Sequence, residues 1–95
     1  MIIIKDLCKM IREELDDAEK YAKEYILTQE KDARLADMFK RLAQSELEHA
    51  NMEHNEAVRL IREYGGTPPE GMQAVWDWEH ELLMEKTAKI KSMIN

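Results

Sequence analysis

The sequence predicts an all-α protein with a long helical hairpin followed by a third helix. Charged residues make up 36% of the chain and aromatic residues only 6%. Such a mixture, rich in Glu, Lys, Ala, Leu and Met, favours helices over sheets. Apolar residues recur at alternating steps of three and four along three long segments, which is the spacing of a buried helix face. The connections between these segments are short, so neighbouring helices should run antiparallel.

The size and charge of the chain restrict its function class. With 95 residues, 44% of them hydrophobic, the chain is expected to form one globular domain over residues 1–95. A net charge of −6 is unfavourable for binding nucleic acid or an anionic membrane and suits cationic partners, including metal ions. Cys8 is the only cysteine, which excludes a disulfide framework and is typical of a reducing cytosol. No segment approaches a signal sequence or a membrane span, so we expect a cytoplasmic protein.

The first helix is expected over about residues 4–27, before the polar break at residues 28–31. Its apolar stripe is interrupted once, by the carboxylate of Glu14. The stripe consists of Ile4, Leu7, Ile11, Glu14, Ala18, Tyr21 and Tyr25.

The second helix is expected over about residues 33–64. Asp32 is suited to the N-cap position, and Gly65-Gly66 directly after the last periodic residue is a C-terminal signal. At about 1.5 Å per residue this helix would be about 50 Å long. Such a length is unusual for a domain of this size and suggests that a partner chain covers part of the helix. Its stripe consists of Leu35, Phe39, Leu42, Glu46, His49, Glu53, Glu56 and Leu60.

The third helix is expected over about residues 68–93. Thr67 can cap its N-terminus, with Pro68 at the first helical position and Glu70 as the reciprocal acceptor of a capping box. Its stripe consists of Met72, Trp76, Glu79, Leu83, Lys86, Ile90 and Met93.

Each predicted helix therefore carries a carboxylate on its apolar stripe: Glu14, Glu46 and Glu79. A carboxylate inside a core costs several kcal/mol unless it is compensated, so a shared cation is one explanation. Glu46 and His49 are spaced i, i+3 and leave the same face of their helix. A carboxylate beside an imidazole suits iron, manganese or zinc. Glu53, further along this stripe, would be either a solvated residue or a secondary ligand.

The alternative interpretations are structural. Glu46 and His49 could form a polar patch on an exposed helix face, and Glu14 could lie on a stripe that drifts around its helix. Glu79 could be an interface residue paired with Lys86 of a neighbouring chain instead of a ligand. Two further histidines lie off the stripes and are expected to be exposed: His54 and His80.

Two segments give the chain a resemblance to the ferritin-like superfamily: Glu14-Leu-Asp-Asp-Ala-Glu-Lys-Tyr21 and Leu42-Ala-Gln-Ser-Glu-Leu-Glu-His-Ala50. In ferritins, rubrerythrins and encapsulated ferritins, the first bundle helix carries a ligand Glu with a Tyr seven residues later, and the second carries Glu-x-x-His. The resemblance implies that Glu14, Glu46 and His49 are metal ligands and that Tyr21 is a neighbouring group behind them. It covers residues 4–60 and is vague over the third helix.

The number of ligands implies a fold completed by dimerisation. A four-helix di-iron carboxylate site takes a Glu from each of two helices and Glu-x-x-His from each of the other two. This chain supplies one Glu and one Glu-x-x-His, which is half of that set. Two chains related by a two-fold axis would complete the site and the four-helix bundle. We therefore expect a homodimer or a larger even-numbered homo-oligomer, as in the encapsulated ferritins that the chain resembles.

The resemblance implies a non-haem di-iron protein that oxidises Fe2+ with oxygen or peroxide, as ferroxidases do. A rubrerythrin-like peroxidase or oxidase is an alternative, although a four-cysteine iron module cannot be formed from Cys8 alone. A non-enzymatic helical interaction module is a second alternative. An encapsulin shell is a further candidate partner, but residues 89–95 contain no recognisable targeting extension of the kind that encapsulated ferritins carry.

Overall fold

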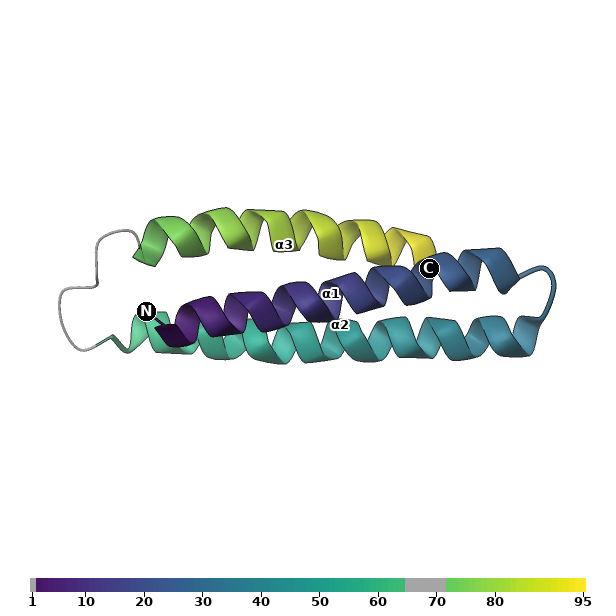
Figure 1. Ribbon diagram of the computed structural model, residues 1–95, viewed down its shortest axis with the longest axis horizontal. Helices are drawn as coiled ribbons and strands as arrows, with labels where there is room; N and C mark the ends of the chain where they lie inside the picture. The colour runs from purple at the N-terminus through teal and green to yellow at the C-terminus, as the bar shows by residue number, and fades with distance from the viewer. Residues whose placement is uncertain (1, 65–71) are drawn as a thin grey trace.

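The computed structural model describes residues 2–64 and 72–95, and these residues form three helices: α1 (Ile2–Thr28), α2 (Ala33–Arg62) and α3 (Met72–Ile94). No strand occurs within the two described ranges, which confirms the all-α prediction. The molecule is a rod of 55 × 17 × 17 Å (Figure 1). None of its described helices combines the length and the apolar character that crossing a membrane requires.

The helix ends follow local capping chemistry. α1 extends to Thr28, one residue beyond the expected bound, and the Thr28 hydroxyl donates a 2.8 Å hydrogen bond to the Glu24 carbonyl. Asp32 caps α2 as predicted, since its Oδ1 accepts a hydrogen bond from the Leu35 N–H at 3.1 Å. α2 ends at Arg62, two residues before the expected bound of 64. Several predicted signals lie outside the described residues: Gly65-Gly66, the capping box of Thr67, Pro68 and Glu70, and the expected start of the third helix at residue 68.

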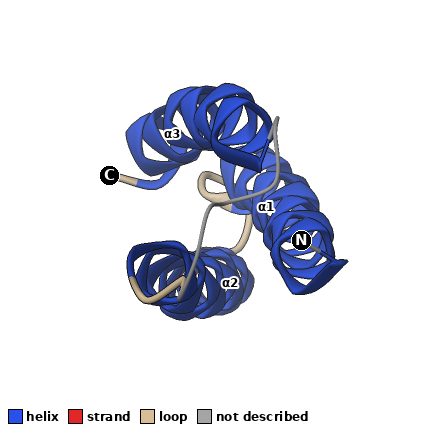
Figure 2. Ribbon diagram, turned by 90° about the vertical axis from the view of Figure 1, so that its left-hand side faces the viewer, coloured by secondary structure: helices blue, strands red, loops and turns tan. Residues whose placement is uncertain are grey.

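The three helices are not packed symmetrically. α1 and α2 form an antiparallel hairpin, and α3 runs in the same direction as α1 (Figure 1). Viewed along the rod, α1 stands between the other two helices, while α2 and α3 face each other across an open side (Figure 2). α3 therefore packs chiefly against α1 and touches α2 little. This arrangement leaves the face of the α1–α2 hairpin that is turned away from α3 uncovered.

Small side chains occupy the fully buried positions of α2 and part of the buried face of α1. Ala18 and Ala22 of α1 are completely buried, and one core cluster joins them to Ala43 and Ala50 of α2 and to bulky residues that include Ile11, Leu15, Leu83 and Ile90. Small residues allow two helix axes to approach toward the lower end of the usual range of about 8–10 Å. On α2 the buried residues repeat every seven positions and are all alanine: Ala36, Ala43, Ala50 and Ala57.

Ion pairs join α3 to α1 along their shared edge. Lys89 Nζ lies 3.0 Å from a Glu19 carboxylate oxygen, and Lys86 contacts Asp16. The Lys89 ammonium is also the main reason that the pKa of Glu19 is lowered. Lys86 thus pairs within its own chain, although the sequence suggested it as a partner for Glu79 of a neighbouring chain.

Candidate metal centre

Glu14 of α1 meets Glu46 and His49 of α2 on the uncovered face of the hairpin. One ligand atom from each residue lies within 4.8 Å of the other two. His49 Nδ1 is 3.4 Å from Glu14 Oε2 and 3.5 Å from Glu46 Oε1. The three residues predicted as primary ligands are therefore together, and one imidazole faces two carboxylates from different helices.

The helix geometry explains why these side chains meet. Glu46 and His49 are three residues apart, so their side chains leave α2 on one face about one turn apart. They lie between two buried alanines, Ala43 and Ala50. Because these alanines hold α2 close to α1, the carboxylate of Glu14 can reach across the seam to both residues.

The cluster is partly open to solvent. The side chains of Glu14 and Glu46 are 24% and 20% exposed, whereas that of His49 is 52% exposed. The carboxylates thus lie at the base of the site and the imidazole at its outer edge. An ion held here would have protein ligands on one side and open coordination positions on the other.

The pKa shifts of the two carboxyl groups point to a proton shared between them when no cation is bound. A hydrogen bond to Glu14, burial and the charge of Glu14 together raise the pKa of Glu46 to about 7. The same hydrogen bond, assisted by His49, lowers the pKa of Glu14 although burial opposes the shift. Two carboxyl groups at this separation cannot easily both be ionised. A metal ion would relieve the repulsion by replacing the shared proton.

The spacing of the donor atoms fits a transition-metal ion. Metal–nitrogen and metal–oxygen bonds of about 2.0–2.2 Å place neighbouring ligand atoms of a tetrahedral or octahedral ion about 3.0–3.5 Å apart. The two distances from His49 Nδ1, 3.4 and 3.5 Å, already fall in this range. The ligand atoms of Glu14 and Glu46 lie within 4.8 Å of each other.

Glu53 lies beside the cluster, whereas Glu56 does not contribute to it. Glu53 Oε2 is buried and has no hydrogen-bond partner among the described residues. Burial, followed by the charge of Glu14, raises the pKa of Glu53. Glu56 is exposed and pairs with Arg59 at 2.7 Å. Glu53 is therefore placed to act as a further ligand, whereas Glu56 forms an ion pair in solvent.

Tyr21 is on the same face but is held by packing. It is half-buried, and its ring stacks on Phe39 with the centroids 6.5 Å apart. Among the described residues, no hydrogen bond joins the Tyr21 hydroxyl to Glu14 or Glu46. Tyr21 is therefore held by packing against Phe39 and does not orient a ligand.

Glu79 lies away from the cluster. It is buried, and its Oε2 is 3.7 Å from Arg12 Nε. Arg12 and Glu14 are two residues apart on α1, so their side chains project about 200° apart around the helix. Glu79 thus occupies the α1–α3 contact, and the structure does not bring all three stripe carboxylates to one cation.

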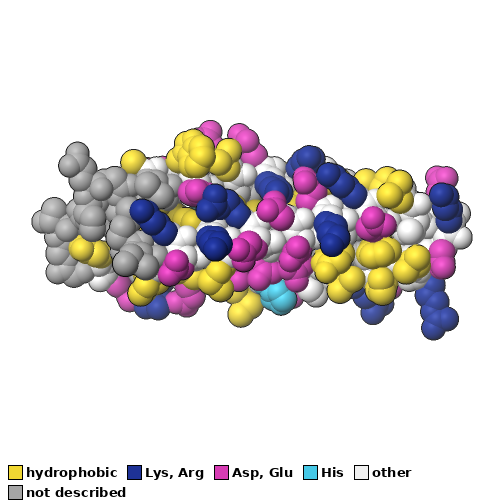
Figure 3. Space-filling view, in the orientation of Figure 1, with side chains coloured by type: hydrophobic (Ala, Val, Ile, Leu, Met, Phe, Trp, Pro, Cys, Tyr) yellow, Lys and Arg dark blue, Asp and Glu magenta, His cyan; other side chains and the backbone are white. Residues whose placement is uncertain are grey.

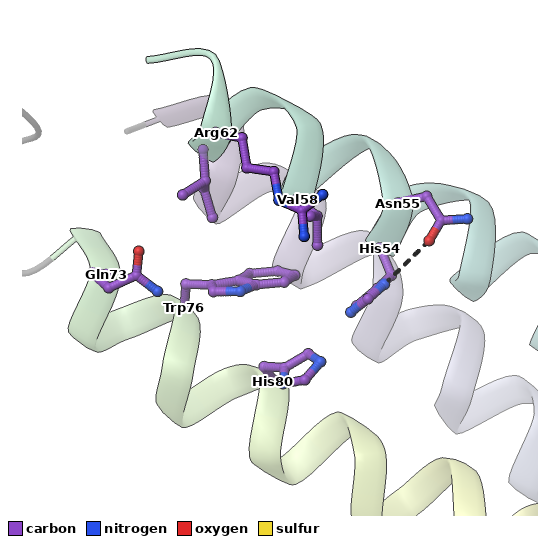
Figure 4. Close-up of a pocket in the computed structure, with 8 residues that line it drawn as sticks. His54, Asn55, Val58, Arg62, Gln73, Trp76 and His80 are labelled. Atoms are coloured by element: carbon purple, nitrogen blue, oxygen red, sulfur yellow. Dashed lines mark hydrogen bonds between the residues drawn. The ribbon is translucent and has the colours of Figure 1, made fainter. Parts of the chain in front are cut away.

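The prediction that His54 and His80 are exposed is wrong. Both are half-buried and pack with the buried Trp76 between α2 and α3 (Figure 4). His54 lies off the α1–α2 seam because it packs toward α3, and His80 is the residue of α3 that it meets. The i, i+4 spacing of Trp76 and His80 was the available sequence signal, since it places two rings on one face of α3.

Comparison with known proteins leaves the family open. No protein-family model, curated protein or solved structure gives a significant match to this chain. The resemblance to ferritin-like proteins therefore rests on the sequence motifs alone.

Proposed function

We propose that this protein is a ferritin-like ferroxidase whose di-metal site forms between two copies of the chain. The observation that carries the proposal is the convergence of Glu14, Glu46 and His49 at a partly open position on the hairpin. Carboxylates and an imidazole are ligands that suit iron, manganese and zinc. Among these metals, iron has the redox chemistry that a carboxylate-rich site of this kind serves.

The stoichiometry supports a site shared by two chains. One chain provides two carboxylates and one imidazole, and a di-metal carboxylate centre in a four-helix bundle uses four carboxylates and two imidazoles. A two-fold axis passing beside His49 would supply the second set from identical residues. It would also cover the imidazole, whose side chain is 52% exposed in a single chain.

Apolar side chains around the cluster support the same dimer. Met10 and Leu42 each lie four residues before a ligand carboxylate, and Leu35 lies one further heptad along α2, so they share its face. They are 45%, 36% and 39% exposed, respectively. Hydrophobic side chains lie on both sides of an acidic band that includes a histidine (Figure 3). An apolar surface interrupted by a few metal-binding groups is what two hairpins would bury on forming a four-helix bundle.

In the proposed reaction Fe2+ is the substrate. Two Fe2+ ions each lose one electron, and O2 takes up both electrons and two protons to give two Fe3+ and hydrogen peroxide. The carboxylates of Glu14 and Glu46 hold both oxidation states, and His49 binds as a neutral imidazole. Because Glu46 carries the shared proton, binding of the ion releases a proton from this residue.

The proposal is tested with a variant that removes the α2 ligands, Glu46→Ala plus His49→Ala. The wild-type protein should bind about one iron per chain in an even-numbered oligomer and oxidise Fe2+ rapidly under air, and the variant should lose both properties. Glu48→Ala is the matched control, since Glu48 is exposed on the opposite face of the same helix and its loss should leave the rate unchanged. Rapid oxidation in the double variant would refute the assigned site, and a metal-free wild-type monomer would refute the function.

The same preparation separates the alternatives. A rubrerythrin-like peroxidase would consume peroxide faster than oxygen at the same Fe2+ concentration. A non-enzymatic interaction module would form its oligomer without metal and show no oxidation. A chain purified with stoichiometric zinc or manganese that does not exchange for Fe2+ would point to those ions instead.

A further inference from the structure

A second cluster of aromatic side chains lies between α2 and α3, away from Glu14. The rings of His54 and His80 are 4.9 Å apart between centroids, and Trp76 lies 5.4 and 5.5 Å from the two imidazoles. The three residues line a pocket of about 600 Å³ (Figure 4). His54 projects from α2 toward His80 on α3, so each helix provides one imidazole.

One nitrogen of this cluster lacks a partner. His54 Nε2 is buried and accepts no hydrogen bond from any described residue. His54 Nδ1 faces the side-chain oxygen of Asn55 at 3.5 Å, and this oxygen can only accept, so the ring proton is assigned to Nδ1. Nε2 then carries a buried lone pair without a donor, which is a costly arrangement. An imidazole whose other N–H is held by an oxygen is the usual form of a metal-ligating histidine.

The separation of the two rings suits a single bound ion. A metal–nitrogen bond of about 2.1 Å plus about 1.1 Å from nitrogen to ring centre puts each centroid about 3.2 Å from the ion. Two centroids 4.9 Å apart would give a nitrogen–metal–nitrogen angle of roughly 100° once one nitrogen of each ring turns toward the ion. This value is close to the tetrahedral angle that zinc favours.

We propose that His54 and His80 form a second metal site, selective for ions that prefer imidazole, such as Zn2+, Ni2+ or Cu2+. No carboxylate among the described residues lines this pocket, so hard cations such as Mg2+, Ca2+ and Mn2+ lack the charged oxygen ligands that they prefer. The pocket leaves room for water or a small ligand at the remaining coordination positions. The site does not depend on the proposed ferroxidase centre, because it shares no residue with it.

The test uses Trp76 as a reporter in a Trp78→Phe background. Trp78 is 64% exposed and removing it leaves one indole, beside the proposed site. Ni2+ should quench the fluorescence of Trp76 saturably, and Mg2+ should not. The quenching should survive His49→Gln, the matched control in the other cluster, and the Ni2+ affinity should fall at least tenfold in His54→Gln and in His80→Gln. Quenching that is unaffected by His80→Gln, or that is abolished by His49→Gln, would overturn the proposal.

A measurement on the wild-type protein guards against variants that fail to fold. The chain has only three histidines, so their ring resonances can be assigned and followed during a Zn2+ titration. The proposal requires the ring resonances of His54 and His80 to shift together and with equal midpoints. If only the His49 resonances respond, the paired imidazoles are a packing feature and the second site does not exist.

Discussion

Raising the pH from 5 to 8 should destabilise the metal-free protein through Glu46. The pKa of this group is about 7 in the folded protein, against 4.5 for an ordinary glutamate. A raised carboxyl pKa means that the folded state binds the proton more tightly than the unfolded state. Its contribution to stability is therefore complete below pH 4.5 and is lost as the pH rises through 7. Glu14 does not cancel this loss, since its lowered pKa affects stability only below pH 4.5.

The size of the effect follows from the two pKa values. For one group with a folded pKa of about 7 and an unfolded pKa of 4.5, the protonation contribution to stability is about 2.5 kcal/mol at pH 5 and near zero at pH 8. Solvent around this partly exposed site screens the interaction, so we expect a loss of about 2 kcal/mol. The raised pKa of Glu53 acts in the same direction.

The assay is urea unfolding at fixed protein concentration with a chelator present, repeated between pH 5 and pH 8. Glu46→Gln should flatten most of the pH dependence, because the amide keeps a donor for Glu14 without titrating. Adding a divalent ion at pH 8 should restore the lost stability in the wild type and not in the variant. An unchanged slope in Glu46→Gln, or a wild type that gains stability toward pH 8, would refute the shared-proton description of the site.

Three further predictions concern assembly and packing. Chelation should raise the dissociation constant of the dimer, as followed by sedimentation velocity, and an unchanged constant would argue against ligands from both chains. Ala50→Leu should retain helical circular dichroism, lower stability by about 1–3 kcal/mol and weaken metal binding at least tenfold, whereas Ala88→Leu at an exposed position should do neither. Arg12→Gln should destabilise the fold by roughly 1 kcal/mol because it leaves the buried Glu79 without a counter-charge. That loss should largely disappear in the Glu79→Gln background, and equal losses in both backgrounds would exclude the pair as its cause.

The part of the site that α1 and α2 form could be predicted from the sequence, because all of its residues lie along a single contact between these two helices. Glu14, Glu46 and His49 interrupt the apolar stripes of the first two helices, but Glu79 interrupts a stripe as well. The motif spacing that resembles ferritin-like proteins, and not periodicity alone, separated the three residues that meet from Glu79. The cap at Asp32 was equally local and was confirmed. Dimerisation and the identity of the metal stay predictions, because periodicity describes one helix face and not what covers it.

The third helix was harder to place because a stripe does not reveal which neighbour it faces. α3 packs on the side of α1 opposite the metal cluster, so Glu79 meets Arg12 instead of Glu14. His54 and His80 were assigned to solvent because only one stripe on each helix was considered. A helix that contacts two neighbours has two buried faces, and His54 lies on the face of α2 that packs with Trp76 and His80 of α3.

The alanine repeat of α2 extends the functional requirement beyond residues that can bind an ion. At Ala43 and Ala50, a larger side chain would force the hairpin apart, and glycine would weaken the helix by about 1 kcal/mol. In a saturation-mutagenesis screen for metal occupancy, these chemically inert positions should tolerate as few substitutions as the ligands themselves. The screen should therefore show a line of intolerant positions every seven residues along α2, with the ligands on one side of it. The small side chains of these alanines are then as necessary for metal binding as the carboxylates.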